Sequence, residues 1–176
     1  TGTTGLNGKK FNSKEELIEI LNDTQPGQDL AYFLNSNWSA KSAEEGGNRG
    51  RGKTLFLAAS QGSRISFDSL RSSDGAYVFG QIYLDRDKQV TFQLHYDEEG
   101  KNFFKQKVQN AIAPLNTTGT RVFITSPDAL VIKSIKEGAL LSFISYSRWE
   151  IIKKFGAKIF VDDGIEKKIC DLSPMV

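Results

Sequence analysis

One segment of the chain carries residues whose types and spacing match a phosphate-binding motif. Residues 47–54 read Gly-Asn-Arg-Gly-Arg-Gly-Lys-Thr and follow the pattern G-x-x-x-x-G-K-T, in which glycine amides wrap the phosphates of a nucleotide. In such a loop Lys53 would contact the terminal phosphates and Thr54 would hold Mg²⁺. The candidate nucleotide-binding residues are therefore Gly47, Gly52, Lys53 and Thr54.

The sequence around this motif does not supply the scaffold that nucleotide binding needs. A buried strand normally delivers the glycine loop, and a helix begins directly behind it. The preceding residues 35–45 are polar, and residues 55–57 suit a strand as well as a helix. The middle of the chain is typical of hairpins, not of alternating strands and helices. We therefore favour a solvated glycine-rich loop at 47–54 and predict no cofactor.

The same region contains the cations and the aromatic ring that a nucleic-acid contact would use. Arg49, Arg51 and Lys53 alternate with glycines, and Trp38 precedes them as a ring on which a base could stack. Two nearby glutamates offset part of this charge, and the whole chain has a net charge of only +2. Because a nucleic-acid-binding domain is normally basic as a whole, the sequence favours a protein partner over nucleic acid.

Few other residues offer catalytic or metal-binding chemistry. His95 is the only histidine, and its place in an alternating strand predicts a surface position outside any Ser–His–Asp site. Cys170 is the only cysteine, which excludes an intramolecular disulfide and a cysteine-based zinc site. The carboxylates gather in turns, which favours solvated corners over an active site. They include Asp85, Asp87, Asp97, Glu98, Glu99, Asp162 and Asp163.

Length and composition predict a β-rich, soluble protein of about one domain. The chain has 176 residues, of which 39% are hydrophobic, and no apolar run approaches the ~18 residues of a membrane-spanning helix. The small polar residues 1–5 favour an exported protein over a cytoplasmic one. Asn-x-Ser/Thr sequons at Asn22, Asn37 and Asn116 are compatible with export.

Helical patterns occur in two segments. Ser13 is a good N-cap, and Glu16 completes a capping box by reaching back to the Ser13 amide; the apolar stripe that follows is stopped by residues 22–27. Residues 102–113 repeat apolar side chains at helical spacing, with the packed part at Phe104–Ile112. Two segments fit a strand or a helix equally well, namely residues 29–34 and 149–155.

Alternating or short apolar runs predict strands through the rest of the chain. The most regular pair is 76–84 and 89–96, where apolar and polar residues alternate on either side of a turn, as in an antiparallel hairpin. A tight turn at 136–138 separates two of the later strands. The predicted strands are residues 54–59, 64–67, 76–84, 89–96, 120–125, 130–135, 138–146 and 157–161.

These elements predict an α+β fold that is mainly an antiparallel β-sheet or sandwich, with an N-terminal helix and one further packed helix. We expect about seven to nine strands. Residues 1–12 are expected to be a flexible N-terminal segment. A single domain at 13–176 follows, and it contains a long glycine-rich loop at 35–52.

Both faces of the strand at 76–84 are apolar, so a helix, the long loop or a partner must cover the second face. We therefore expect a non-catalytic protein-interaction or assembly module, with nucleotide binding or hydrolysis at 47–54 as the alternative. A carrier of a small apolar ligand between sheet faces is a third possibility. The candidate interaction residues are Trp38, Arg49, Arg51, Tyr77, Phe79 and Tyr83.

Overall fold

The computed structural model describes most of the chain. The described residues are 4–23, 25–35, 56–87, 89–108, 112–124, 126–147, 153–154, 156, 158–162 and 165–170. They belong to two compact units, Thr1–Ser126 and Pro127–Val176, each with its own helices and strands. The single domain expected at 13–176 stays a prediction. Most of the loop expected at 35–52 lies outside the described residues.

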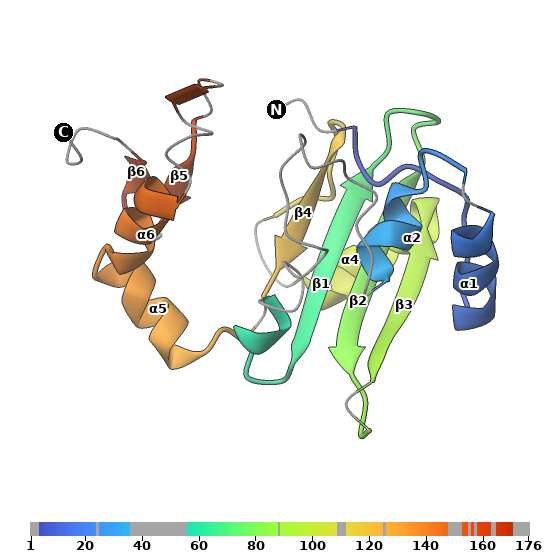
Figure 1. The fold of residues 1–176 in the computed structure, drawn as a ribbon, viewed down its shortest axis with the longest axis horizontal. Helices are drawn as coiled ribbons and strands as arrows, with labels where there is room; N and C mark the ends of the chain where they lie inside the picture. The colour runs from blue at the N-terminus through green and yellow to red at the C-terminus, as the bar shows by residue number, and fades with distance from the viewer. Residues whose placement is uncertain are drawn as a thin grey trace. The chain divides into compact units, whose positions relative to one another are not determined.

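The first unit is built on a four-stranded antiparallel sheet (Figure 1). β2 and β3 form the predicted hairpin, in which Leu84 pairs with Val90 beside the turn. The sheet and its helices confirm the predicted α+β class. The strand order is β3-β2-β1-β4, so β3 and β4 are the edges. The strands are β1 (Arg64–Leu70), β2 (Tyr77–Leu84), β3 (Val90–Tyr96) and β4 (Gly119–Phe123).

Two helices of the N-terminal region, α1 (Lys14–Asn22) and α2 (Asp29–Leu34), pack on one face of the sheet. α1 begins as predicted, because the Ser13 hydroxyl accepts a hydrogen bond from the Glu16 amide at 3.1 Å. The Glu16 carboxylate reaches back to the amide of Asn12 and not to that of Ser13. The open choice at 29–34 is decided in favour of a helix.

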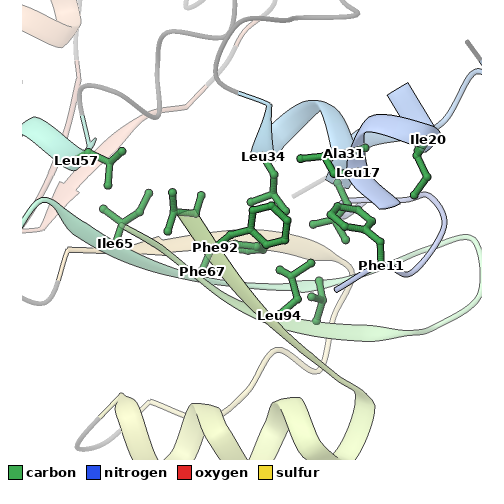
Figure 2. Packing of buried hydrophobic residues seen from close by; sticks show 13 residues of the cluster. Phe11, Leu17, Ile20, Ala31, Leu34, Leu57, Ile65, Phe67, Phe92 and Leu94 are labelled. Atoms are coloured by element: carbon green, nitrogen blue, oxygen red, sulfur yellow. The ribbon is translucent and has the colours of Figure 1, made fainter. Parts of the chain in front are cut away.

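Apolar side chains from these helices and from the sheet form the larger hydrophobic core (Figure 2). The rings of Phe11 and Phe92 meet edge to face, with centroids 5.8 Å apart. Leu57 joins the same cluster from a helical turn at residues 56–58, where a strand was predicted. Burying a leucine side chain contributes about 1.5–3 kcal/mol to the stability of the fold. This gain favours a buried Leu57 in a helical turn as much as in a strand.

The opposite face of the sheet is covered by α4 (Asp97–Lys107). Its Phe104 packs on Tyr77 and Phe79 of β2 and forms a second buried cluster. The helix begins before the predicted residue 102, with acidic side chains in its first turn and lysines in its last, which suits the helix dipole. Of the three predicted ways to cover the second apolar face of β2, a helix of the same chain is the one observed.

The second unit corrects two of the predicted strands. Residues 130–135 and 138–146 are helical, so both strand predictions are wrong. The elements of this unit are the helices α5 (Ala129–Lys136) and α6 (Ala139–Ser147) and the paired strands β5 (Phe160–Asp162) and β6 (Lys167–Ile169).

Local hydrogen bonds account for helices in this stretch of β-branched residues. The Asp128 carboxylate caps α5 by accepting from the Leu130 amide at 2.8 Å. Gly138 follows with φ 75, the left-handed conformation that ends many helices. Strand preference depends on packing against a pleated surface more than on the residue itself. With both segments helical, the described residues hold six strands, fewer than the predicted number.

Candidate functional site

Seven residues singled out in the sequence lie outside the described residues. Partner contact through the loop at 35–52 and nucleotide binding at 47–54 therefore stay predictions. Cys170 is buried and is a free thiol in the described part of the chain. The seven residues are Trp38, Gly47, Arg49, Arg51, Gly52, Lys53 and Thr54.

The other candidate interaction residues lie on β2. Tyr77 and Phe79 are only 1% and 0% exposed, beneath α4. Burial and the negative charge of Asp68 raise the pKa of Tyr77, whose hydroxyl donates to Asp68 at 3.1 Å. Tyr83 is half-buried, and the Arg64 guanidinium lies 5.3 Å from the centre of its ring. Tyr77 and Phe79 thus belong to the interior in this conformation and are not available to a partner.

His95 lies where β3 meets α4. Its Nδ1 atom is 2.9 Å from the Glu99 carboxylate, and its ring stacks on Phe103 with centroids 3.6 Å apart. These contacts leave the side chain 19% exposed, so it is more covered than the surface histidine that the sequence predicts. No group of three metal-binding side chains occurs in the described part of the chain. His95 therefore connects β3 to the first turns of α4.

β3 is an edge strand without the features that usually discourage strand pairing. Its seven residues, Val-Thr-Phe-Gln-Leu-His-Tyr, include no lysine, carboxylate or proline. Among the described residues, β2 is its only strand neighbour, and no backbone hydrogen bond from another segment reaches it. An edge strand of this kind directs backbone N–H and C=O groups outward, where another chain can pair with them.

β4, at the other edge, is protected. Arg121 on this strand forms an ion pair at 2.5 Å with Asp68, which is fully buried on β1. A short edge strand and an inward-pointing charge are two devices that discourage pairing, and β4 has both, since it has only five residues. Of the two edges, β3 is the one suited to accept another strand.

A groove runs beside β3. A hollow of about 300 Å³ is lined by the successive residues Phe92 to Tyr96, together with Asn12 and Glu99. Because successive residues of a strand face opposite sides of the sheet, a hollow that touches all of them lies at the strand's edge. A second hollow of about 500 Å³ is lined by residues 9–12, by α1 and by its C-cap Asp23, and it shares only Asn12 with the first. Both hollows are shallow and open to solvent, and together we call them the β3 groove.

Two carboxylates of α1 and the carboxylate of its C-cap residue, Asp23, line this groove. They lie on one face of the helix, because their positions follow the spacing i, i+3 and i+7. Asp23 is paired with Lys9 at 3.1 Å, and Glu16 accepts from the Asn12 amide at 2.7 Å. Glu19 forms no ion pair within the described residues. The residues of α1 and its C-cap that line the groove are Glu16, Glu19, Ile20 and Asp23.

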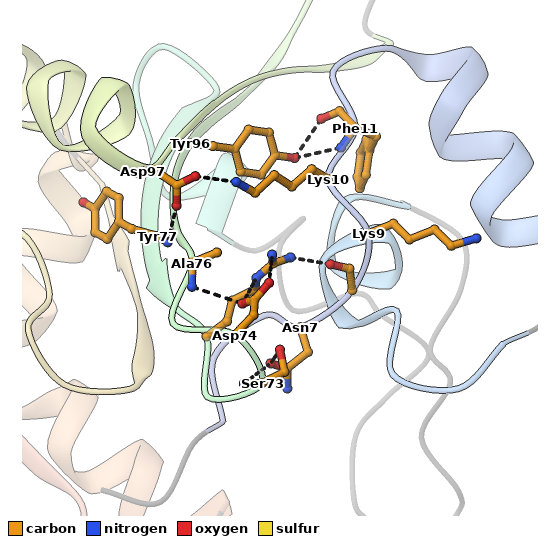
Figure 3. A network of polar contacts seen from close by, with 12 residues as sticks. Asn7, Lys9, Lys10, Phe11, Ser73, Asp74, Ala76, Tyr77, Tyr96 and Asp97 are labelled. Atoms are coloured by element: carbon orange, nitrogen blue, oxygen red, sulfur yellow. Dashed lines mark hydrogen bonds and ion pairs between the residues drawn. The ribbon is translucent and has the colours of Figure 1, made fainter.

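The segment ahead of α1 is fixed to the end of β3 by paired polar contacts (Figure 3). The Tyr96 hydroxyl accepts from the Phe11 amide at 3.0 Å and donates to the Phe11 carbonyl at 2.8 Å. The Lys10 ammonium group pairs with Asp97, and this hydrogen bond lowers the pKa of the Asp97 carboxyl. These contacts hold the segment that lines the groove in a defined position against the sheet.

Arg71 fixes the same segment at Gly8, farther along the chain from α1. The Arg71 side chain is 3% exposed, and its guanidinium donates to the Gly8 carbonyl and pairs with Asp74 at 2.5 Å. Asn7 accepts a hydrogen bond from the Ser73 hydroxyl at 2.9 Å. Residues 4–12, the described part of the segment that the sequence predicts as flexible, are thus hydrogen-bonded to β1, to β3 and to the turn between β1 and β2.

Comparison of the chain with protein-family models, with curated proteins and with solved structures gives no match. No described helix is both long and apolar enough to cross a membrane. The molecule's own features therefore describe it: it is an α+β protein in which, among the described residues, no strand pairs with the outer edge of β3, and in which the acidic helix α1 packs against β3.

Proposed function

We propose that this chain is a non-catalytic protein-interaction module that binds an extended segment of a partner protein along the edge of β3. In this mode the partner adds a strand to the sheet, and its backbone bonds to the outward N–H and C=O groups of the edge. The observation that carries the proposal is that an uncharged, proline-free edge strand opens directly onto a groove.

The dimensions and the chemistry of the edge fit such a ligand. A seven-residue strand extends over about 23 Å at ~3.3 Å per residue, which matches a partner segment of similar length. Phe92 and Leu94 turn into the core beneath α1 and α2, while Gln93 is exposed. Alternate side chains of an added strand would therefore face α1 on one side and Glu99 of α4 on the other.

Site-specific photo-crosslinking tests the proposal. A photoreactive residue in place of Gln93 should capture a partner in extract of the native source. The same residue in place of Gln61, also an exposed glutamine but in the turn before β1, should not. Mass spectrometry then identifies the crosslinked segment, and a synthetic peptide of that segment is added to the intact protein.

Hydrogen exchange supplies the decisive measurement. The peptide should slow exchange of the backbone amides in residues 90–96, because an added strand pairs with those that point outward. Equal crosslinking at positions 93 and 61, or a captured segment that leaves exchange in β3 unchanged, would contradict strand addition at this edge.

We also propose that the module acts outside the cytoplasm. The acceptor asparagines of two of the three sequons, Asn22 and Asn116, are exposed, as an acceptor for glycosylation must be. The third, at Asn37, lies outside the described residues. Treatment of protein from the native source with a peptide N-glycosidase should increase its gel mobility. Unchanged mobility, with unmodified Asn22 and Asn116 found by mass spectrometry, would remove this support for export.

A further inference from the structure

We infer that the partner segment is basic, and that one of its lysine or arginine side chains pairs with Glu19 of α1. This inference rests on the proposed function, because it names the chemistry of the strand that β3 would accept. The evidence for it is the set of charged side chains that line the β3 groove and the ion pairs and hydrogen bonds that these side chains already form.

The groove has an excess of negative charge. Its lining includes two lysines and four carboxylates, which leaves two negative charges unbalanced if His95 is neutral. Neither lysine offsets this excess at Glu19, since Lys9 pairs with Asp23 and Lys10 pairs with Asp97. A basic segment would complement this surface, and an acidic one would meet like charge, which costs affinity.

Glu19 is the acidic group best placed for this contact. It lies between Glu16 and Asp23 on the groove-facing stripe of α1. The Glu16 carboxylate is already bonded to the Asn12 amide, and Glu99 is bonded to His95. The Glu19 carboxylate is exposed and forms no ion pair in the described part of the chain. The Glu19 carboxylate is therefore available to pair with a cationic side chain of an added strand.

Matched peptides test the inference on the intact chain. Three fluorescein-labelled nonapeptides of alternating valine and threonine would carry two lysines, two serines or two glutamates at the same threonine positions. Fluorescence anisotropy should give the tightest Kd for the lysine peptide and the weakest for the glutamate peptide. This order should shrink as salt is raised, because exposed charges are screened within ~8 Å at 0.15 M ionic strength.

Two variants of α1 separate a contact with Glu19 from a general effect of charge. Glu19→Gln should weaken binding of the lysine peptide about two- to fivefold, as expected for one solvent-exposed ion pair. Glu15→Gln removes the same charge from an exposed position that does not line the groove. It should leave this Kd unchanged, and neither variant should change the Kd of the serine peptide.

The outcomes distinguish this inference from the proposed function. Equal Kd values for the lysine and serine peptides, or equal effects of the two variants, would overturn the basic segment while leaving strand addition intact. If no peptide slows amide exchange in residues 90–96, strand addition is overturned as well. A dimer seen by light scattering, with those amides protected before peptide is added, would identify a second copy as the occupant and overturn both.

Discussion

Asp68 and Arg121 lie opposite each other on β1 and β4 and form a bidentate ion pair. The Arg121 Nε and Nη2 atoms donate to the two Asp68 carboxylate oxygens at 2.9 and 2.5 Å. Asp68 also accepts from the Tyr77 hydroxyl and from the Leu115 amide, each at 3.1 Å. A fully buried carboxylate needs such partners, because burying an unpaired charge costs several kcal/mol. The pair therefore fixes β4 to β1, whereas at the other edge no described strand pairs with the outer side of β3.

Replacing Asp68 with asparagine should destabilise the first unit by about 2–4 kcal/mol. The variant breaks a buried pair and leaves the Arg121 charge unpaired; the lower part of the range reflects the 31% exposure of the Arg121 side chain. Urea unfolding measures the change. Asp87→Asn, which makes the same substitution at an exposed turn, should stay within about 0.5 kcal/mol. Similar losses in the two variants would contradict the assigned role of the pair.

Stability should fall at alkaline pH because of Tyr77. Burial, then the charge of Asp68, raise the pKa of Tyr77 above its ordinary value of 10.0. The folded state thus holds this proton more tightly than the unfolded state, so the contribution to stability is complete below pH 10 and decreases as pH rises above it. Urea unfolding between pH 8 and 11 should show this decrease.

The Tyr77→Phe variant separates this proton from other alkaline effects. It should be less stable than the parent at pH 8, since the hydrogen bond to Asp68 is lost, and its stability should decline less above pH 10. Tyr83→Phe, on the same strand but half-buried, serves as the control. Parallel profiles for Tyr77→Phe and the parent protein would exclude Tyr77 as the source of the decline.

Gly80 of β2 should not tolerate a side chain. A Cβ atom at this position would lie 2.3 Å from the Phe67 ring and 2.9 Å from Leu94, both in the core. Gly80→Ala should therefore cost about 1–3 kcal/mol, as overpacking does. Gly62→Ala is the matched control, because nothing lies within 4 Å of a Cβ atom there. Thermal unfolding compares them, and equal midpoints would show that the sheet adjusts without strain.

We expect no stabilisation by nucleotide. The residues that precede the motif at 47–54 are polar, so the sequence predicts none of the buried strand that such a site requires. A site occupied at one hundred times its Kd adds about 2.7 kcal/mol to the free energy of unfolding, which a thermal melt with Mg-ATP or Mg-GTP detects readily. A raised midpoint that disappears in a Lys53→Ala variant would establish the alternative function.

Local sequence patterns correctly predicted the helices and strands in which the preferences of the residues agree with their tertiary environment. Ser13 and Glu16 marked the start of α1, and alternation over 76–84 and 89–96 gave the hairpin of β2 and β3. The same reasoning failed at 130–135 and 138–146, because a short apolar run fits either a strand or a helix, and caps and packing decide between them. The burial of Asp68 and its pairing with Arg121 could not be predicted from the sequence, because a single buried aspartate in a strand has the same sequence pattern as a solvent-exposed one.

The sequence alone determined the class of fold, the absence of a disulfide within this chain, and the two chemical ingredients of the groove. These ingredients are an uncharged stretch at 90–96 and acidic residues along one face of α1. Tertiary structure decided that the uncharged stretch is a sheet edge and that α1 packs against it through the core. Strand order depends on contacts between residues far apart in the chain, and the periodicity of a single segment does not predict those contacts.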